Sequence, residues 1–179
     1  MAENLRTEWG NRQMKRRNVL LGAGAVVALA GCSGGSKFKR YNGPEVTYVV
    51  VNKGARKMYL FHGDKVLEQY DIKLGFAPEG HKQFEGDGRT PEGIYRIDRR
   101  NPNSKYHLSI GISYPNQADV AAAEAMGKRP GGDIFIHGQE FPFKADKGDW
   151  TWGYISVKNT EIEDIYAMVR DGTPIAINP

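Results

Sequence analysis

Two apolar runs joined by a polar loop constrain the fold of this chain more than any other stretch. The first run, residues 132–139, carries His137, and the second spans residues 149–157. Short apolar runs bounded by glycine and polar residues are typical of strands. Where two strands end side by side, one can hold a base next to a reacting or binding group of the other, and glycine lets the backbone come close. The sequence therefore predicts a site at these strand ends, with His137 as its candidate base.

The rest of the domain predicts a mainly β architecture with two short helices. Alternating apolar residues indicate strands at residues 47–51, 57–61, 66–74, 94–97, 107–114 and 174–178. An alanine-rich helix is expected at residues 118–126, ended by a glycine. A second helix is expected to begin with a capping box at Thr160–Glu163 and to end at Gly172. This pattern favours a β-sandwich or barrel with the helices at its margin.

Composition matters here for what it excludes. With 40% hydrophobic and 26% charged residues, the chain is expected to form one compact domain, which we place at residues 46–178. Residues 1–31 hold five Lys or Arg against two Asp or Glu, a net +3 out of the chain's +4, which leaves +1 for the remainder. A nearly neutral domain gives no electrostatic reason to expect nucleic acid or an acidic membrane surface as a partner.

The N-terminal residues predict export rather than a folded element. A basic stretch is followed by a small-residue apolar run at residues 19–30, too short for an ordinary spanning helix, and then by Gly31 and Cys32. The order resembles a bacterial lipoprotein signal, which implies that residues 1–31 are removed and that Cys32 carries lipid. An uncleaved membrane anchor is the alternative. Residues 32–45 are then a polar tether, and the single cysteine of the chain leaves no thiol in the domain.

The two central runs carry a recognisable motif. His137 and Gly138 are followed, after a gap, by Thr151, one residue, Gly153 and then Tyr154. This spacing resembles the signature of the L,D-transpeptidase (YkuD-type) family of peptidoglycan cross-linking enzymes, in which a His-Gly pair precedes Ser/Thr-x-Gly-Cys. In this chain Tyr154 occupies the position of the family's nucleophilic cysteine.

A second motif supports the resemblance. Residues 90–95 read Thr-Pro-x-Gly-x-Tyr, which the family carries before one of its core strands. The resemblance covers about residues 46–178 and implies a YkuD-type β fold. Trp152 and Ser156 depart from the His and Arg that the family often has at those positions.

The resemblance also implies a set of roles. In the family a cysteine thiolate attacks a peptide bond of a peptidoglycan stem, a histidine takes the thiol proton, and backbone N–H groups stabilise the oxyanion. Carried over, His137 is the base, Gly138 belongs to its turn, and Thr151 and Gly153 flank the nucleophile position. Backbone N–H groups near Gly153 and Tyr154 are the expected oxyanion donors.

Tyr154 is a poor substitute for a thiol. A phenol has an ordinary pKa of about 10, against about 8.5 for cysteine, so a working phenolate needs a downward shift of about 3 pKa units, or about 4 kcal/mol. Its ring also occupies space that a donor carbonyl needs. Thr151 and Ser156 are the other candidate hydroxyl nucleophiles. His137 is accordingly a base in an altered reaction, a vestige beside Tyr154, or a buried histidine bonded to backbone.

These observations predict a lipid-anchored protein of the bacterial cell envelope, facing the periplasm and on the outer membrane if the cell has one. The expected partners are a peptidoglycan stem peptide or an envelope glycan, on which Trp150 and Trp152 could stack, and the membrane through Cys32. We expect binding or regulation without the cysteine mechanism. The alternative is a hydrolase or glycan transferase that uses Tyr154 with His137. Nothing predicts a cofactor or a metal site, and the oligomeric state is not indicated.

Overall fold

The computed structural model describes residues 35–140 and 148–179, and residues 35–179 form one compact unit. The predicted export signal at residues 1–31 and the predicted lipid site at Cys32 lie outside the described residues. Of the predicted tether, the described part contacts the domain: Lys37 Nζ donates to Pro102 O (2.6 Å), and Lys39 Nζ to Asp164 Oδ1 (2.8 Å). In the described residues no helix has the length and apolar character needed to cross a membrane.

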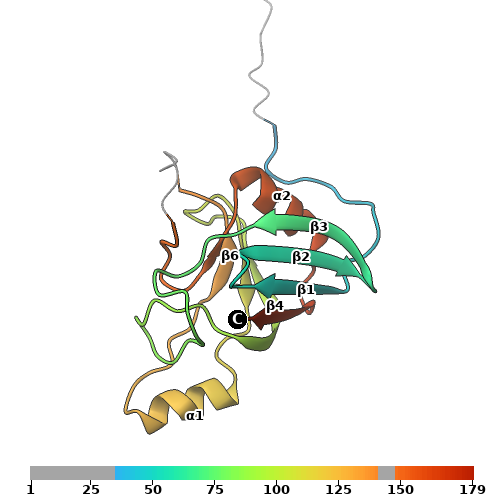
Figure 1. Ribbon diagram of the computed structural model, residues 1–179. Helices are drawn as coiled ribbons and strands as arrows, with labels where there is room; N and C mark the ends of the chain where they lie inside the picture. Colours follow the sequence, from blue (N-terminus) through green and yellow to red (C-terminus); the bar gives the residue numbers. More distant parts are fainter. Residues whose placement is uncertain (1–34, 141–147) are drawn as a thin grey trace, which may run out of the picture. The chain divides into compact units, whose positions relative to one another are not determined.

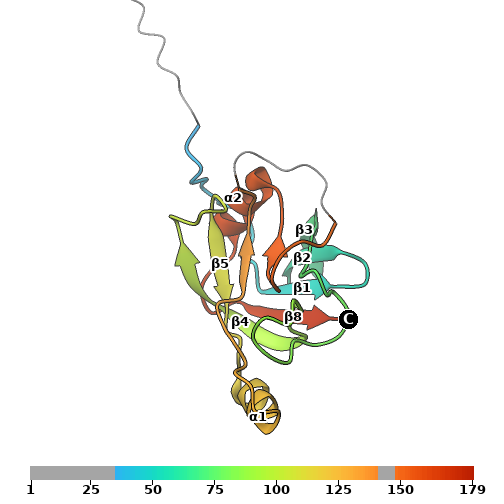
Figure 2. The ribbon, with the colours of Figure 1, turned by 90° about the vertical axis from the view of Figure 1, so that its left-hand side faces the viewer.

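One eight-stranded sheet forms the body of the unit, in the order β3-β2-β1-β8-β4-β5-β6-β7. Figure 1 labels β1–β4 and β6, and Figure 2, turned by 90°, also labels β5 and β8. The strands are β1 (Tyr48–Asn52), β2 (Lys57–His62), β3 (Lys65–Asp71), β4 (Gly93–Asn101), β5 (Ser109–Ile112), β6 (Phe135–His137), β7 (Ile155–Ser156) and β8 (Pro174–Asn178). The mainly β expectation is confirmed, with the sheet curled into a half-barrel.

Two backbone hydrogen bonds join β7 and the turn before it to the chain that follows β3. Lys73 N–H donates to Ser156 O (2.9 Å), and Thr151 N–H donates to Leu74 O (3.1 Å). These bonds curl the sheet, because strands at opposite ends of its order are drawn together. The curl brings the chain around Thr151 and Ser156 to the end of β6.

The two predicted helices are present at the margin of the sheet (Figure 1). Helix α1 (Gln117–Ala125) begins after Asn116, whose side chain accepts hydrogen bonds from the first turn. Helix α2 (Asn159–Met168) contacts β5 and β6 through a buried apolar face. The buried residues of that face are Ile162, Ile165 and Met168.

The predicted start of the second helix is wrong. Thr160 is not its cap: α2 begins at Asn159, and Glu161 accepts a hydrogen bond from Lys158 N–H (2.8 Å). The helix starts here because β7 ends at Ser156 and leaves only two residues before the first turn. Asn159 takes a structural role instead, since its Oδ1 accepts from Gln139 N–H (2.6 Å) just beyond β6.

Strands β5, β6 and β7 are buried on both faces. Ile110, Ile136 and Ile155 stand in one row across them, because Ile110 pairs with Ile136 and Ile136 with Ile155. All three side chains are fully buried in the hydrophobic core. The opposite face of the same strands carries His137, and it is this face that holds the candidate site.

Candidate active site

His137 is the last residue of β6 and is almost completely buried, with 2% of its surface exposed. Its Nδ1 lies 2.6 Å from the carbonyl oxygen of Gly138. A carbonyl only accepts, so Nδ1 carries the proton and the neutral ring has an unprotonated Nε2. Among the described residues Nε2 has no hydrogen-bond partner. His137 therefore has an unprotonated Nε2 whose lone pair has no partner among the described residues.

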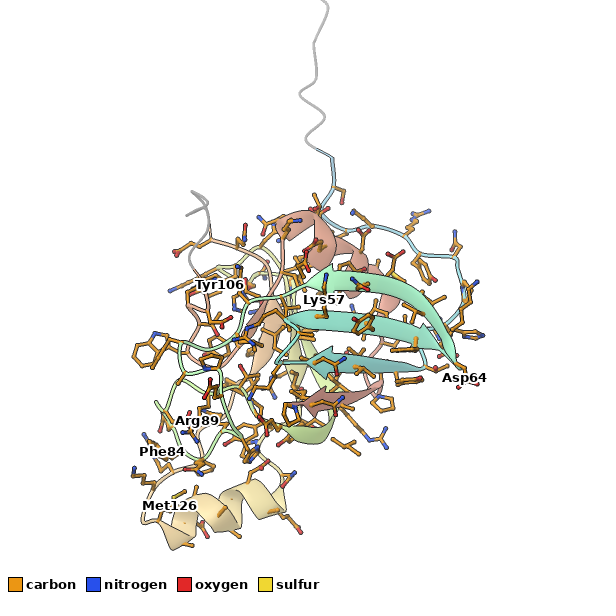
Figure 3. The ribbon with its side chains drawn as sticks, in the orientation of Figure 1. Lys57, Asp64, Phe84, Arg89, Tyr106 and Met126 are labelled. Carbon is orange, nitrogen blue, oxygen red and sulfur yellow. The ribbon has the colours of Figure 1, made fainter. Side chains whose placement is uncertain are left out.

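Aromatic rings surround this imidazole. Tyr106, Trp150 and Tyr154 have ring centroids 4.5, 5.7 and 5.7 Å from that of His137. Figure 3 labels Tyr106, which comes from the loop between β4 and β5. Burial among these rings lowers the pKa of His137 to about 4, against a smaller opposing effect of the bond to Gly138. The side chain is thus neutral at physiological pH.

Residues 151–154 form a tight turn at the entrance to β7. Thr151 is buried, its Oγ1 donates to Tyr154 O (2.7 Å), and it accepts from Gly153 N–H (3.3 Å). Gly153 has φ +111°, and a Cβ placed there would lie 2.5 Å from Arg89 O. Only glycine suits both the dihedral angle and the close approach. The bond to Thr151 also engages one of the two N–H groups expected as oxyanion donors.

An ion pair supports this turn from behind. Asp149 Oδ2 lies 2.7 Å from Arg56 Nη2, and Asp149 Oδ1 accepts from Leu74 N–H (2.8 Å). Arg56 has a positive φ of 52° in the turn between β1 and β2. The connection holds the chain before Thr151 against the opposite end of the curled sheet.

Tyr154 and His137 lie together, as their strand positions predict, but no hydrogen bond joins them among the described residues. The two rings meet edge to face, at 79°. Burial raises the pKa of the Tyr154 phenol, with smaller contributions from the charge of Asp133 and from Tyr106. The phenol is thus more firmly protonated than an ordinary tyrosine, and the neighbouring imidazole, being neutral, gives no charge that would offset this.

A cavity of about 200 Å³, the His137 cavity, lies in front of His137 and Tyr154. Its other lining residues are Asn101, Ser104, Lys105, Tyr106, Ser109 and Phe135. Tyr154 also lines a second hollow of about 360 Å³, on which Trp152 and Asp133 border. Trp152 is 65% exposed and packs edge to face on the exposed Phe76, with ring centroids 4.9 Å apart. The site thus combines a buried base with aromatic surface open to a ligand.

Of the eight residues that line the His137 cavity, only His137 and Tyr154 were singled out by the sequence reasoning. Ser109 and Tyr106 lie near the start of the strand predicted at residues 107–114. Side chains alternate along a strand, so Ser109 points to the face of the sheet that its apolar neighbours Leu108 and Ile110 do not share. The sequence therefore indicates a polar residue on that face. Only the pairing of β5 with β6 shows that this face meets His137.

The predicted absence of a metal site stays a prediction. Within the described ranges, no group of three or more His, Cys, Asp and Glu side chains is placed to hold a metal ion. Two carboxylates on the loop before β4 are engaged in ion pairs. Glu92 pairs with the buried Lys53 (2.8 Å), and Glu85 pairs with Arg129 (2.6 Å) at the surface.

Comparison with known proteins settles the family. The model of the L,D-transpeptidase catalytic domain (YkuD) matches residues 46–177. This chain belongs to that family. The matched residues contain no cysteine, because the single cysteine of the chain is Cys32.

Individual relatives agree with this assignment. The putative L,D-transpeptidase YafK of Escherichia coli is 29% identical over 129 residues, which are 68% of this chain and 46% of YafK. The helical cell shape determining protein Pgp2 of Campylobacter jejuni is 27% identical, with a TM-score of 0.59 over 76% of this chain and 49% of that one. Bd1075 of Bdellovibrio bacteriovorus shares the fold, at 24% identity and a TM-score of 0.54 over 78% of this chain and 50% of its own. The chain thus spans about half the length of these relatives.

Proposed function

We propose that this L,D-transpeptidase-family protein binds a peptidoglycan stem peptide or another envelope glycan or peptide without the family's cysteine mechanism. The observation that carries the proposal is the position of Tyr154. It follows Thr151-x-Gly153 at the entrance to β7, where the family's motif has its cysteine, and its ring lies against His137 at 5.7 Å. A thioester needs a thiol, and residues 46–177 have none.

The phenol does not replace that thiol. Its pKa is raised by burial, and attack would require a shift in the opposite direction. The ring also fills space beside the base, where a donor carbonyl would have to lie. The arrangement therefore favours a ligand that is held in the His137 cavity without acylating Tyr154.

The nature of the ligand is inferred from the relatives and from the exposed rings. Pgp2 is named for its role in helical cell shape, and a role in cell-wall biogenesis and cell shape is proposed for this chain. Trp152 and Phe76 offer an exposed aromatic surface beside Tyr154. Flat aromatic faces of this kind suit the apolar faces of sugar rings and peptide planes.

A second candidate function is favoured by one observation, the unpartnered Nε2 of His137. A neutral and oriented imidazole with an unpartnered nitrogen can accept a proton, which is the role of a general base. On this reading the protein is an enzyme of altered chemistry, a hydrolase or glycan transferase, in which Tyr154 acts with His137.

The location of the protein is proposed from its first residues. Removal of residues 1–31 and lipidation of Cys32 would place the domain on the envelope membrane, facing the periplasm. Mass spectrometry of the membrane-extracted protein should find an acylated N-terminal cysteine. An intact Met1 on the mature protein would contradict the proposal.

The function is tested with the full-length protein in detergent and tetrapeptide muropeptides. Wild type, Tyr154→Cys, Tyr154→Phe and His137→Ala are compared for binding, for products by mass and for acylation by a carbapenem. We expect wild type to bind without an acyl adduct on Tyr154, and Tyr154→Cys to gain an adduct at position 154. Loss of ring volume costs up to about 3–5 kcal/mol, so the folding of each variant is checked by circular dichroism.

The outcomes separate the candidates. Cross-linking or thioester formation by wild type would reject the binding proposal. If wild type instead converts an envelope substrate, and both Tyr154→Phe and His137→Ala abolish the conversion, the enzyme of altered chemistry is correct. If wild type binds neither muropeptides nor envelope glycans, both candidates fail.

A further inference from the structure

The strand register places four polar residues in one row across the site face of the sheet. Asn101 pairs with Ser109, Ser109 with His137, and His137 with Ser156. Directly paired residues of neighbouring strands point to the same face. Three of the four, Asn101, Ser109 and His137, line the His137 cavity.

Ser109 and His137 form a closely spaced pair within this row. Gly138 N–H donates to Leu108 O (3.3 Å), so Leu108 and Gly138 form a hydrogen-bonded pair next to the pair of Ser109 and His137. Pairs alternate between the two types in an antiparallel ladder, so Ser109 and His137 are the non-hydrogen-bonded type, with Cα atoms about 4.5 Å apart. Their side chains therefore stand next to each other on the cavity side.

Of the three hydroxyl groups of Thr151, Ser156 and Ser109, only that of Ser109 has no hydrogen bond among the described residues. Thr151 Oγ1 donates to Tyr154 O, and Ser156 Oγ donates to Gly138 O at 3.4 Å. Ser109 is 97% buried, and among the described residues no hydrogen bond involves its hydroxyl. It thus borders the cavity beside a histidine whose Nε2 is also without a partner.

We propose that Ser109 is a nucleophile in this cavity, with His137 as its general base and Gly138 O as the group that orients the base. These are the three parts of a nucleophile–base–orienter arrangement. No hydrogen bond joins Ser109 to His137 in the structure, and such contacts are commonly longer before substrate binds. The proposal goes beyond binding, which requires no nucleophile.

The reaction is hydrolysis of a small ester or amide. Ser109 Oγ bonds to the acyl carbon as its proton moves to His137 Nε2, and that proton then goes to the leaving alcohol or amine as the scissile C–O or C–N bond breaks. Water next attacks the acyl carbon and gives a proton to Nε2, which returns a proton to Oγ as the acid leaves. Lys105, which lines the cavity, favours an acyl group that carries a carboxylate.

The experiment uses the full-length protein in detergent with a fluorophosphonate reporter, which forms a stable adduct with an activated serine. Adducts are located by peptide mass spectrometry in wild type, Ser109→Ala and Ser113→Ala. Ser113 is the control, because it follows the same strand but does not line the cavity. We expect an adduct on Ser109 in wild type, at least 100-fold slower labelling in Ser109→Ala, and the wild-type rate in Ser113→Ala.

The pH profile tests the role of His137. Labelling should slow as pH falls through about 4, where the imidazole takes up a proton, and His137→Gln should lose the wild-type rate as Ser109→Ala does. Ser109→Cys tests access independently, since a reachable thiol beside the base should be alkylated by iodoacetamide at position 109.

Three results would overturn the proposal. These are no adduct on wild type, an adduct at another residue that persists in Ser109→Ala, or a folded Ser109→Cys whose new thiol is not alkylated. Muropeptide binding is measured on the same samples. Intact binding without labelling rejects the nucleophile alone, whereas labelling without binding rejects the proposed function alone.

Discussion

The strands β1–β3 and the strands β5–β7 follow the same alternation but use their second faces differently. In the first set, Val49 and Leu60 point into the core, while Gln69 on the other face is exposed. In the second set the core face is isoleucine, and the opposite face, with Ser109 and His137, is buried as well.

The difference comes from what covers the second face. Within residues 35–140 and 148–179, no helix or strand lies on the outer face of the β2–β3 hairpin in Figure 1, whereas the rings of Tyr106 and Trp150 lie against His137. Covering removes water from polar groups, and a group without a partner there is destabilising. The second face of β5–β7 thus carries a cost in stability that the hairpin does not, as expected of a functional site.

The largest expected effect concerns the face that the two sets have in common. Ile136→Ala and Leu60→Ala each remove a fully buried side chain from the same core, and each should lower the free energy of unfolding by about 2–5 kcal/mol. Urea unfolding of both variants measures this. Ser109→Ala should cost less than either one. If Ser109→Ala lowered the free energy of unfolding as much as Ile136→Ala, the second face would stabilise the fold as much as the core face does. That result would contradict the difference between the two faces.

The next effect is a pH dependence of stability that comes from His137, on the second face of β5–β7. The pKa of His137 is about 4 in the folded protein, below its ordinary value of 6.5, so as pH falls the unfolded chain takes up the proton first. The contribution of His137 to the free energy of unfolding is therefore fully present above pH 6.5. It falls between pH 6.5 and pH 4, by about 2–3 kcal/mol at pH 4.5.

Urea unfolding at pH 7 and pH 4.5 tests this effect. His137→Gln should lose this part of the pH dependence. His62→Gln, at the exposed end of β2, should keep the wild-type dependence and serves as the matched control. An unchanged dependence in His137→Gln would show that another group is responsible.

The smallest effect concerns the turn that presents Tyr154. Gly153→Ala introduces a Cβ at φ +111° and 2.5 Å from Arg89 O, so we expect a loss of about 1–3 kcal/mol. Gly172→Ala is the control, because φ there is +92° but no atom lies within 4 Å of the new Cβ. Thermal unfolding should show a greater loss for Gly153→Ala. Equal losses would mean that the dihedral angle alone matters at this turn.

Much of the fold could be predicted from alternation, since it reports burial on one face of a strand directly. Strand β2 and the terminal strand β8 lie within one residue of their predicted ends. The strand predicted at residues 66–74 is less regular, with β3 ending at Asp71 and the chain continuing through the bonds of Lys73 and Leu74 to the far end of the sheet. Bonds of that kind depend on the curl of the whole sheet, which no local pattern encodes.

The site was predicted in part for the same reason. His137 and the turn at Thr151 could be recognised because their residue types and spacing are unusual. Ser109 could not, because a serine flanked by apolar residues in a strand is ordinary until its cross-strand partner is known. Thr160 misled for the opposite reason, since its local pattern suits a helix cap but the exit of β7 sets the start of α2.

By itself the sequence determined the strands, the two helices, the lack of cysteine in residues 46–177 and the presence of a histidine at the end of a buried strand. The tertiary structure alone decided the protonation of His137, because the desolvating rings come from two distant loops. It also decided which hydroxyl stands beside the base, because strand register joins Ser109 to a residue 28 positions away. Local patterns report what one segment prefers, whereas charge state and proximity depend on segments that only folding brings together.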